Sequence, residues 1–173
     1  LEKACGADGW QALGGKCLGR GQHLQRILAE REGSRMKRSI LVIEDNEQNM
    51  YLIKYLLEDC GYEVRCASDG REGMEQAEAV RPDLILLDIQ LPTMDGYTVA
   101  RNLRRNPNLT DIPIVAVTSY AMPGDREKAM EAGCTGYIEK PIDPDTFEEQ
   151  VKQYLSSNDQ MRGRDHEEDT DRR

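Results

Sequence analysis

Segments that favour β-strands alternate with segments that favour α-helices along most of this chain. Five short runs are rich in aliphatic and β-branched residues, at residues 39–43, 62–67, 84–88, 112–117 and 136–138, and the stretches between them have helical spacing of apolar residues. Residues 84–87 and 114–117 are apolar at every position, which is typical of parallel strands covered on both faces. The alternation therefore predicts an α/β fold of five βα units.

Helices on both faces make the predicted sheet doubly wound, with five parallel strands in the flavodoxin-like order 2-1-3-4-5. Two of the predicted helices have one apolar face opposite a charged face. These apolar faces are formed by Met50, Ile53, Leu57 and Cys60 in the first helix, and by Phe147, Val151 and Leu155 in the last. In such a fold the functional loops lie at the carboxyl ends of the strands.

This pattern covers only part of the 173 residues. Residues 1–35 are rich in glycine and have no strand on which a helix could pack, so we expect a disordered leader, a linker or a non-native extension. From residue 156 onward the charges are mixed and apolar periodicity is absent, so residues 156–173 are expected to form a charged, disordered tail. The folded domain is predicted to span residues 36–155, and both ends should be dispensable for its fold.

Charge and hydropathy exclude several classes of partner. The net charge of −9 lies entirely in residues 36–155, and the backbone of nucleic acids repels such a domain. No apolar run approaches the roughly 20 residues of a membrane-spanning helix, and the first residues have no signal-peptide pattern. The number of cysteines, five, is odd, and no two of them form a CxxC pair. This pattern indicates neither a disulfide framework nor a zinc site. We expect a soluble, cytoplasmic protein that contacts neither nucleic acid nor membrane.

Three carboxylates are predicted to converge at the carboxyl edge of the sheet. Glu44 and Asp45 follow the first strand, Asp88 ends the third, and these strands are neighbours in the order 2-1-3-4-5. Repulsion among the carboxylates calls for a cation with oxygen ligands, and Mg²⁺ suits the site because it also accepts phosphate oxygens. We assign Asp45 and Asp88 as direct ligands, Glu44 as a ligand through a water, and the backbone carbonyl of Gln90 as a further ligand.

A hydroxyl and an ammonium group lie at the ends of the last two strands. Thr118 ends the fourth strand, and Lys140 follows the fifth. Both side chains are expected to point into the same crevice, where they offer a phosphoryl group a hydrogen-bond donor and a counter-charge. The arrangement predicts a phosphoryl site in which Asp88 is the nucleophile and forms an aspartyl phosphate, assisted by Thr118 and Lys140.

A resemblance to a known family rests on four segments, LVIEDNEQN, DLILLDIQLPTMDG, IPIVAVTSYAM and GYIEKPI. In this order and spacing they resemble the CheY-like receiver domains of two-component response regulators. They are most similar to single-domain regulators of the DivK type and to the receivers of hybrid kinases. The resemblance covers residues 37–155.

The resemblance implies phosphorelay signal transduction. A histidine kinase or histidine phosphotransferase would phosphorylate Asp88, and a downstream protein effector would detect the change. Thr118 would be the switch hydroxyl, Tyr137 the aromatic switch residue, and Lys140 the lysine that precedes a cis proline, here Pro141. The only reactions implied are the domain's own phosphorylation and dephosphorylation, so the resemblance does not imply an enzyme that acts on other substrates.

Several alternatives remain open. Taken singly, Asp45 or Asn46 is more often a helix N-cap than a metal ligand. A magnesium-dependent phosphohydrolase also uses an aspartate nucleophile, but it needs a carboxylate two residues further on, where this chain has Gln90. A flavodoxin would have to hold a phosphate in the acidic loop after the first strand. The chain is also compatible with the receiver module of a hybrid histidine kinase, with residues 24–35 belonging to an interdomain helix.

Overall fold

The computed structural model describes residues 37–119 and 124–164, with side chains up to Ser156. The predicted leader or linker, residues 1–35, lies outside the described residues, as does the end of the predicted tail, residues 165–173.

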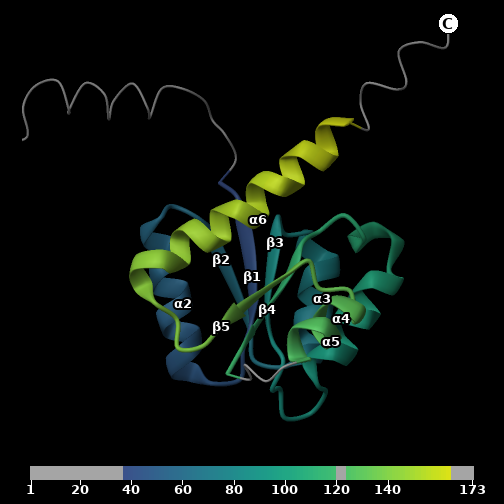
Figure 1. The fold of residues 1–173 in the computed structure, drawn as a ribbon, viewed down its shortest axis with the longest axis horizontal. Coiled ribbons are helices and arrows are strands. Elements are labelled where there is room, and N and C mark those ends of the chain that lie inside the picture. The colour runs from purple at the N-terminus through teal and green to yellow at the C-terminus, as the bar shows by residue number, and fades with distance from the viewer. Residues whose placement is uncertain (1–36, 120–123, 165–173) are drawn as a thin grey trace, which may run out of the picture. The chain divides into compact units, whose positions relative to one another are not determined.

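Within the described residues, five parallel strands form one sheet in the order β2-β1-β3-β4-β5, which confirms the predicted topology (Figure 1). The strands are β1 (Ser39–Ile43), β2 (Glu63–Ala67), β3 (Leu84–Asp88), β4 (Ile114–Thr118) and β5 (Gly136–Glu139). The register pairs Ile43 of β1 with Leu87 of β3, and Asp88 with Val117 of β4. This register brings the residue after β1 beside the last residue of β3.

Each strand is followed by a helix. The helices are α2 (Glu47–Asp59), α3 (Gly70–Val80), α4 (Gly96–Arg105), α5 (Asp125–Glu131) and α6 (Pro144–Arg164), with a short 3-10 helix, η1 (Pro107–Leu109), before β4. Asn46, Asp69 and Asp95 precede α2, α3 and α4, and their side chains accept hydrogen bonds from backbone N–H groups of the first turn. These caps define where three of the helices begin.

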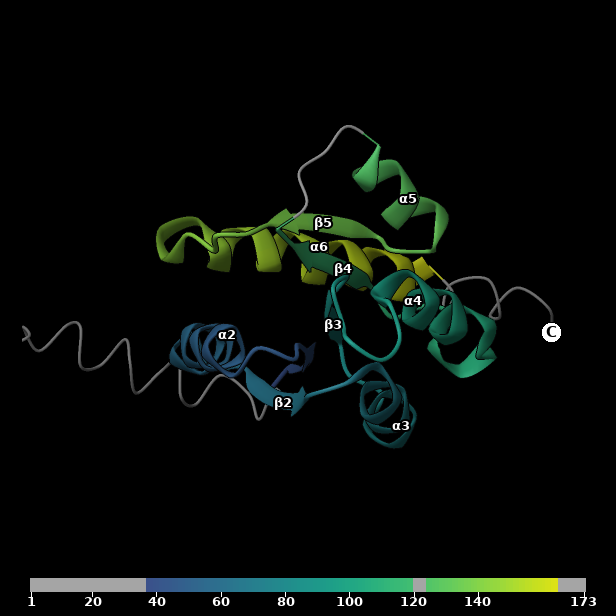
Figure 2. The ribbon, with the colours of Figure 1, turned by 90° about the horizontal axis from the view of Figure 1, so that it is seen from below.

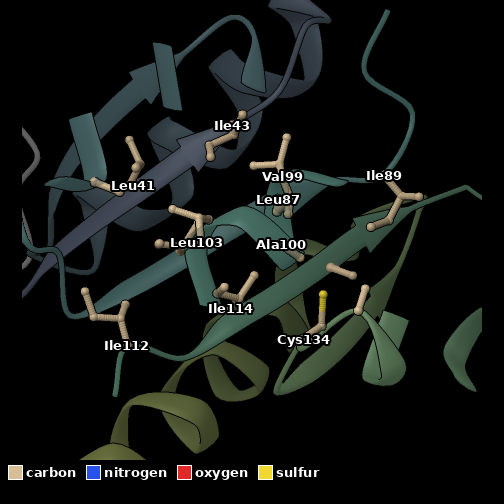
Figure 3. Close-up of a cluster of buried hydrophobic side chains, with 14 of the residues drawn as sticks. Leu41, Ile43, Leu87, Ile89, Val99, Ala100, Leu103, Ile112, Ile114 and Cys134 are labelled. Atoms are coloured by element: carbon tan, nitrogen blue, oxygen red, sulfur yellow. The ribbon is translucent and has the colours of Figure 1, made fainter. Parts of the chain in front are cut away.

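The helices cover the sheet on both faces, as Figures 1 and 2 show. On one face, α2 buries Ile53 and Leu57 and α6 buries Phe147, Val151 and Leu155 against the sheet, and we call this cluster the α2–α6 core. Met50 and Cys60, also predicted on the apolar face of α2, are only half-buried. On the other face, α3, α4 and α5 pack over the α3–α5 core, part of which Figure 3 shows. Central residues of β1 and β3 are buried on both faces, which explains their uninterrupted apolar sequence. Each buried aliphatic side chain contributes about 1.5–3 kcal/mol to the free energy of unfolding.

Two predicted boundaries differ from the structure by more than one residue. β4 begins at Ile114 rather than at residue 112, because Pro113 has no N–H to donate to a neighbouring strand. Helix α6 continues to Arg164, so the prediction of a disordered tail is wrong for residues 156–164. The apolar pattern located the last core residue, Leu155, which is buried. Extending an existing helix needs no further burial, since each added residue gains a backbone hydrogen bond.

Among the residues that the structure describes, no helix is both long enough and apolar enough to cross a membrane.

Candidate functional site

Three carboxylates meet where β1 and β3 end. Glu44 follows β1 directly, and the pairing of Ile43 with Leu87 sets it beside Asp88. Glu44 and Asp88 are buried, with 1% and 4% of their surfaces exposed, whereas Asp45 is exposed. One oxygen from each of these three carboxylates lies within 4.8 Å of the others. The structure therefore brings together the three acidic residues that the sequence predicts.

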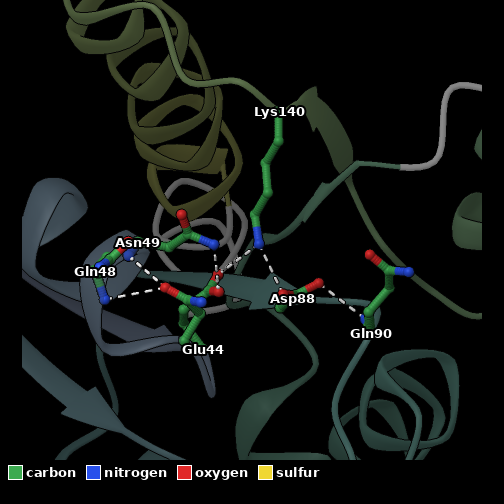
Figure 4. Close-up of polar contacts among 7 residues, drawn as sticks. Glu44, Gln48, Asn49, Asp88, Gln90 and Lys140 are labelled. Atoms are coloured by element: carbon green, nitrogen blue, oxygen red, sulfur yellow. Dashed lines mark hydrogen bonds and ion pairs between the residues drawn. The ribbon is translucent and has the colours of Figure 1, made fainter.

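Lys140 joins two of these carboxylates from a distant part of the chain. Its Nζ atom donates hydrogen bonds to Oε2 of Glu44 and Oδ2 of Asp88, each at 2.7 Å (Figure 4). Burial disfavours the charged ammonium, but the hydrogen bonds to Asp88 and Glu44 outweigh it, so the pKa of Lys140 is raised. For Glu44, burial disfavours the charged carboxylate and raises its pKa, although the hydrogen bonds from Lys140 and Asn49 act in the opposite direction. One ammonium thus faces two buried carboxyl groups.

Two asparagine side chains fix the loop between β1 and α2. Oδ1 of Asn46 accepts hydrogen bonds from the backbone N–H groups of Gln48 and Asn49, both at 3.0 Å, and so caps α2. Nδ2 of Asn49 donates a hydrogen bond to Oε1 of Glu44 at 2.9 Å. Of the two residues for which capping was an alternative, Asn46 is the N-cap and Asp45 is not.

The loop after β3 holds Asp88 from its other side. The backbone N–H of Gln90 donates a hydrogen bond to Oδ1 of Asp88 at 2.8 Å. Helix α4 begins at Gly96, where a Cβ atom would lie 2.4 Å from the backbone carbonyl oxygen of Asp88. Because Gly96 has no side chain, the start of α4 can pack directly against the backbone that carries Asp88.

Strands β4 and β5 supply the remaining predicted residues. Thr118 is buried at the end of β4, and its carbonyl accepts a hydrogen bond from the N–H of Lys140 at 2.9 Å. On β5, Ile138 belongs to the α2–α6 core, while the half-buried Tyr137 packs against the α3–α5 core. Their side chains thus point to opposite faces of the sheet. The peptide bond between Lys140 and Pro141 is cis, as the resemblance implies.

The donor atoms of this cluster fit Mg²⁺. Mg²⁺ prefers oxygen ligands and octahedral geometry, in which opposite ligands lie about 4 Å apart. The oxygens of Glu44, Asp45 and Asp88 lie within 4.8 Å of one another, near enough for one ion to face all three. Two of the three carboxylates are buried, and a cation would relieve their mutual repulsion.

Two contacts were not anticipated from the sequence. The sequence predicts that Lys140 faces a phosphoryl group, and in the structure it also binds Glu44, 96 residues away in the chain. The sequence pattern does not identify Asn49 as a site residue. Its place in the first turn of α2, immediately after the acidic pair, is the signal that could have revealed it, because a side chain there can face back toward the strand end.

Comparisons with known proteins agree with this geometry. A family model described as the response regulator receiver domain matches residues 40–152. The polar-differentiation response regulator DivK of Brucella anthropi is 45% identical over 120 residues, which cover 69% of this chain and 98% of the relative. DivK of Brucella ovis is 44% identical over the same shares of both chains.

Solved structures show the same fold. Chemotaxis protein CheY4 of Vibrio cholerae is 28% identical with a TM-score of 0.66, and the match covers 68% of this chain and 98% of that one. The receiver domain of sensor histidine kinase PA1611 from Pseudomonas aeruginosa has a magnesium ion coordinated in its active-site cleft. It is 35% identical with a TM-score of 0.65, over 69% of this chain and 98% of that one. From its family match, its relatives and its fold, this chain belongs to the CheY-like receiver domains of response regulators.

Proposed function

We propose that this chain is a cytoplasmic phosphoacceptor of a two-component pathway, in which Asp88 receives a phosphoryl group from a phosphohistidine. The observation that carries the proposal is the buried carboxylate of Asp88, bound by Lys140 at 2.7 Å and clustered with Glu44 and Asp45. The cytoplasmic location is supported by the free thiols of Cys60, Cys66 and Cys134, which suit a reducing compartment.

The chain's own residues prepare Asp88 for attack on phosphorus. Lys140 and the N–H of Gln90 bind different carboxylate oxygens, so together they fix the rotation of the carboxyl group. A carboxylate oxygen of Asp88 forms the new bond to phosphorus while the bond from phosphorus to the imidazole nitrogen breaks, and that nitrogen takes up a proton. Lys140 and the Thr118 hydroxyl would stabilise the charge on the phosphoryl oxygens.

Receiver domains bind Mg²⁺ at an acidic pocket, and we propose a ligand set for this one. Asp45, Asp88 and the backbone carbonyl of Gln90 would coordinate the ion directly, and Glu44 would act through a water. Bound Mg²⁺ would neutralise charge on the transferred phosphoryl group. The exposed Asp45 would supply a ligand on the solvent side, and the buried Asp88 one on the protein side.

The proposal is tested by phosphorylation from a small donor. Acetyl phosphate with Mg²⁺ should add one phosphoryl group to the protein, measured by mass spectrometry of the intact protein. Hydroxylamine should remove this group because the linkage is an acyl phosphate. A protein that gains no phosphoryl group from acetyl phosphate, and none from phosphorylated histidine kinases or histidine phosphotransferases, would not be a phosphoacceptor.

The position of exposed apolar side chains supports docking of the donor protein on α2. Tyr51, Leu52 and Tyr55 are 73%, 36% and 58% exposed, and among the described residues the only other exposed large apolar side chain is Met130 on α5. Tyr51 and Tyr55 are four residues apart, so they lie on the same face of α2. This helix begins directly after the acidic loop, so a partner bound to its apolar face would be close to Asp88.

Replacing both tyrosines should separate protein donors from small ones. We expect Tyr51→Ser with Tyr55→Ser to lower the rate of transfer from a phosphorylated histidine phosphotransferase by about tenfold or more, because aromatic interface residues carry much of the binding energy. Phosphorylation by acetyl phosphate should be unchanged. Met130→Ser is the matched control and should transfer normally. Equal slowing with both donors would mean that the tyrosines support the site rather than the docking.

Thr118 on β4 and Tyr137 on β5 support a conformational coupling between Asp88 and a surface that a downstream effector would contact. A phosphoryl group on Asp88 would draw the Thr118 hydroxyl toward it, and the end of β4 would move with Thr118. Tyr137 is half-buried against the α3–α5 core, so its ring can become more buried when the end of β4 shifts. A downstream protein effector would then distinguish the two states at the face formed by α5, β5 and α6.

Thr118→Ala should accept a phosphoryl group, but the resulting conformational change at α5 and Tyr137 should be weak. Beryllofluoride, which stands in for the phosphoryl group, should shift the amide signals of α5 and of Tyr137 in the wild type by NMR. These shifts should be much smaller in the variant, since a coupling on the order of 1–3 kcal/mol is lost. Thr110→Ala, at an exposed threonine before β4, should behave like the wild type. Shifts of full size in Thr118→Ala would rule out this coupling.

A further inference from the structure

The carboxylate of Glu44 is bound at both oxygens by different parts of the chain. Oε2 accepts a hydrogen bond from Nζ of Lys140 at 2.7 Å, and Oε1 accepts one from Nδ2 of Asn49 at 2.9 Å (Figure 4). The side chain is 1% exposed, so water has little access to it. Lys140 is shared with Asp88, whereas the only side-chain hydrogen bond described for the Asn49 amide is the one to Glu44.

A buried glutamate carboxylate that accepts a hydrogen bond from only one donor can still rotate about the bond between Cγ and Cδ. A second donor on the other oxygen fixes that rotation, and an unsatisfied buried oxygen is unfavourable by roughly 1–3 kcal/mol or more. Asn49 is suited to this task because its amide is neutral at every pH and half-buried in the first turn of α2. The Asn46 cap in turn fixes the backbone N–H of Asn49.

We propose that Asn49 is a positioning residue, which holds Glu44 so that its other oxygen faces Lys140 and the proposed ion. The inference rests on the proposed function for its consequence, since a correctly oriented Glu44 is what binds a water of Mg²⁺. Asn49 itself touches neither the ion nor the phosphoryl group. Partners of this kind, outside the direct ligands, commonly change metal affinity by about 10–100-fold.

The first test is made without metal. Asn49→Leu keeps a side chain of similar size but removes the donor, so Glu44 should rotate and the NMR signal of the Lys140 ammonium should shift or broaden. Gln48→Leu is the matched control, because Gln48 is exposed in the same turn and its side chain has no described contact with Glu44. An unchanged Lys140 signal in Asn49→Leu would overturn the proposal.

The second test measures Mg²⁺ affinity by calorimetry. Asn49→Leu should weaken Mg²⁺ binding about tenfold, and Gln48→Leu should not. In a Glu44→Gln background, Asn49→Leu should cause no further loss, since the two residues would act as one unit. A full additional loss in that background would show that Asn49 does not act through Glu44 and would overturn the proposal.

These outcomes separate the inference from the proposed function. If the wild type binds no Mg²⁺ and is not phosphorylated, the proposed function fails, and the Lys140 signal alone decides the role of Asn49. If the wild type binds Mg²⁺ and Asn49→Leu binds it equally well, the positioning role fails and the proposed function stands. Thermal unfolding of each variant confirms that differences in affinity come from folded protein.

Discussion

Asp88→Asn should abolish phosphorylation by acetyl phosphate and by phosphohistidine donors. The amide that replaces the carboxylate has nearly the same shape, but its oxygen is not a competent nucleophile. The variant should still fold, because an amide can accept the hydrogen bond that the N–H of Gln90 donates to Oδ1. Intact mass after incubation with donor and Mg²⁺ should therefore show no added phosphoryl group.

A control at the other end of β3 makes this result specific. Asp83 precedes the strand and accepts a hydrogen bond from the N–H of Ser39 at 2.9 Å, far along the sheet from the acidic cluster. Asp83→Asn makes the same chemical change and should be phosphorylated like the wild type. Undiminished labelling of Asp88→Asn, or labelling that depends on Asp83, would contradict the assignment of Asp88 as phosphoacceptor.

Lys140→Met should lower the free energy of unfolding of the metal-free protein by about 3 kcal/mol at neutral pH. The substitution removes the only described cation between two buried carboxyl groups, and loss of one partner from a buried ion pair typically has an effect of this size. Chemical denaturation of wild type and variant gives the difference directly. Lys152→Met is the control, because Lys152 pairs with Glu148 at the surface, where an ion pair contributes at most about 1 kcal/mol.

The decrease in the free energy of unfolding of Lys140→Met should depend on pH and on Mg²⁺. The pKa of Glu44 is already raised by burial, and removing Lys140 takes away an effect that lowers it. A group with a raised pKa favours folding at low pH, and this contribution is lost as the pH rises through its folded pKa. The variant should therefore be least impaired in acid and most impaired at neutral pH, and excess Mg²⁺ should restore part of its stability. A loss that is equal at all pH values would indicate that Lys140 contributes packing rather than charge.

The sequence predicted the layers because burial leaves a direct trace in the pattern of residues, and the doubly wound fold class then supplied the strand order. Leu84 to Leu87 are apolar without a break, since β3 is covered on both faces, and Phe147, Val151 and Leu155 recur at helical spacing on α6. The same pattern could not place the end of α6, since the helix continues after its last buried residue. Pro113 shortened β4 for a local reason that the apolar pattern does not express.

The sequence by itself determined which side chains gather at the carboxyl edge of the sheet. In a parallel sheet of known order, Glu44, Asp45 and Asp88 must lie there because each follows or ends a strand. Only the tertiary structure decided how these groups pair. Lys140 binds Glu44 and Asp88 across 96 and 52 residues, and Asn49 binds the second oxygen of Glu44. Such contacts depend on atomic distances across different strands and helices, and periodicity along one chain does not specify those distances.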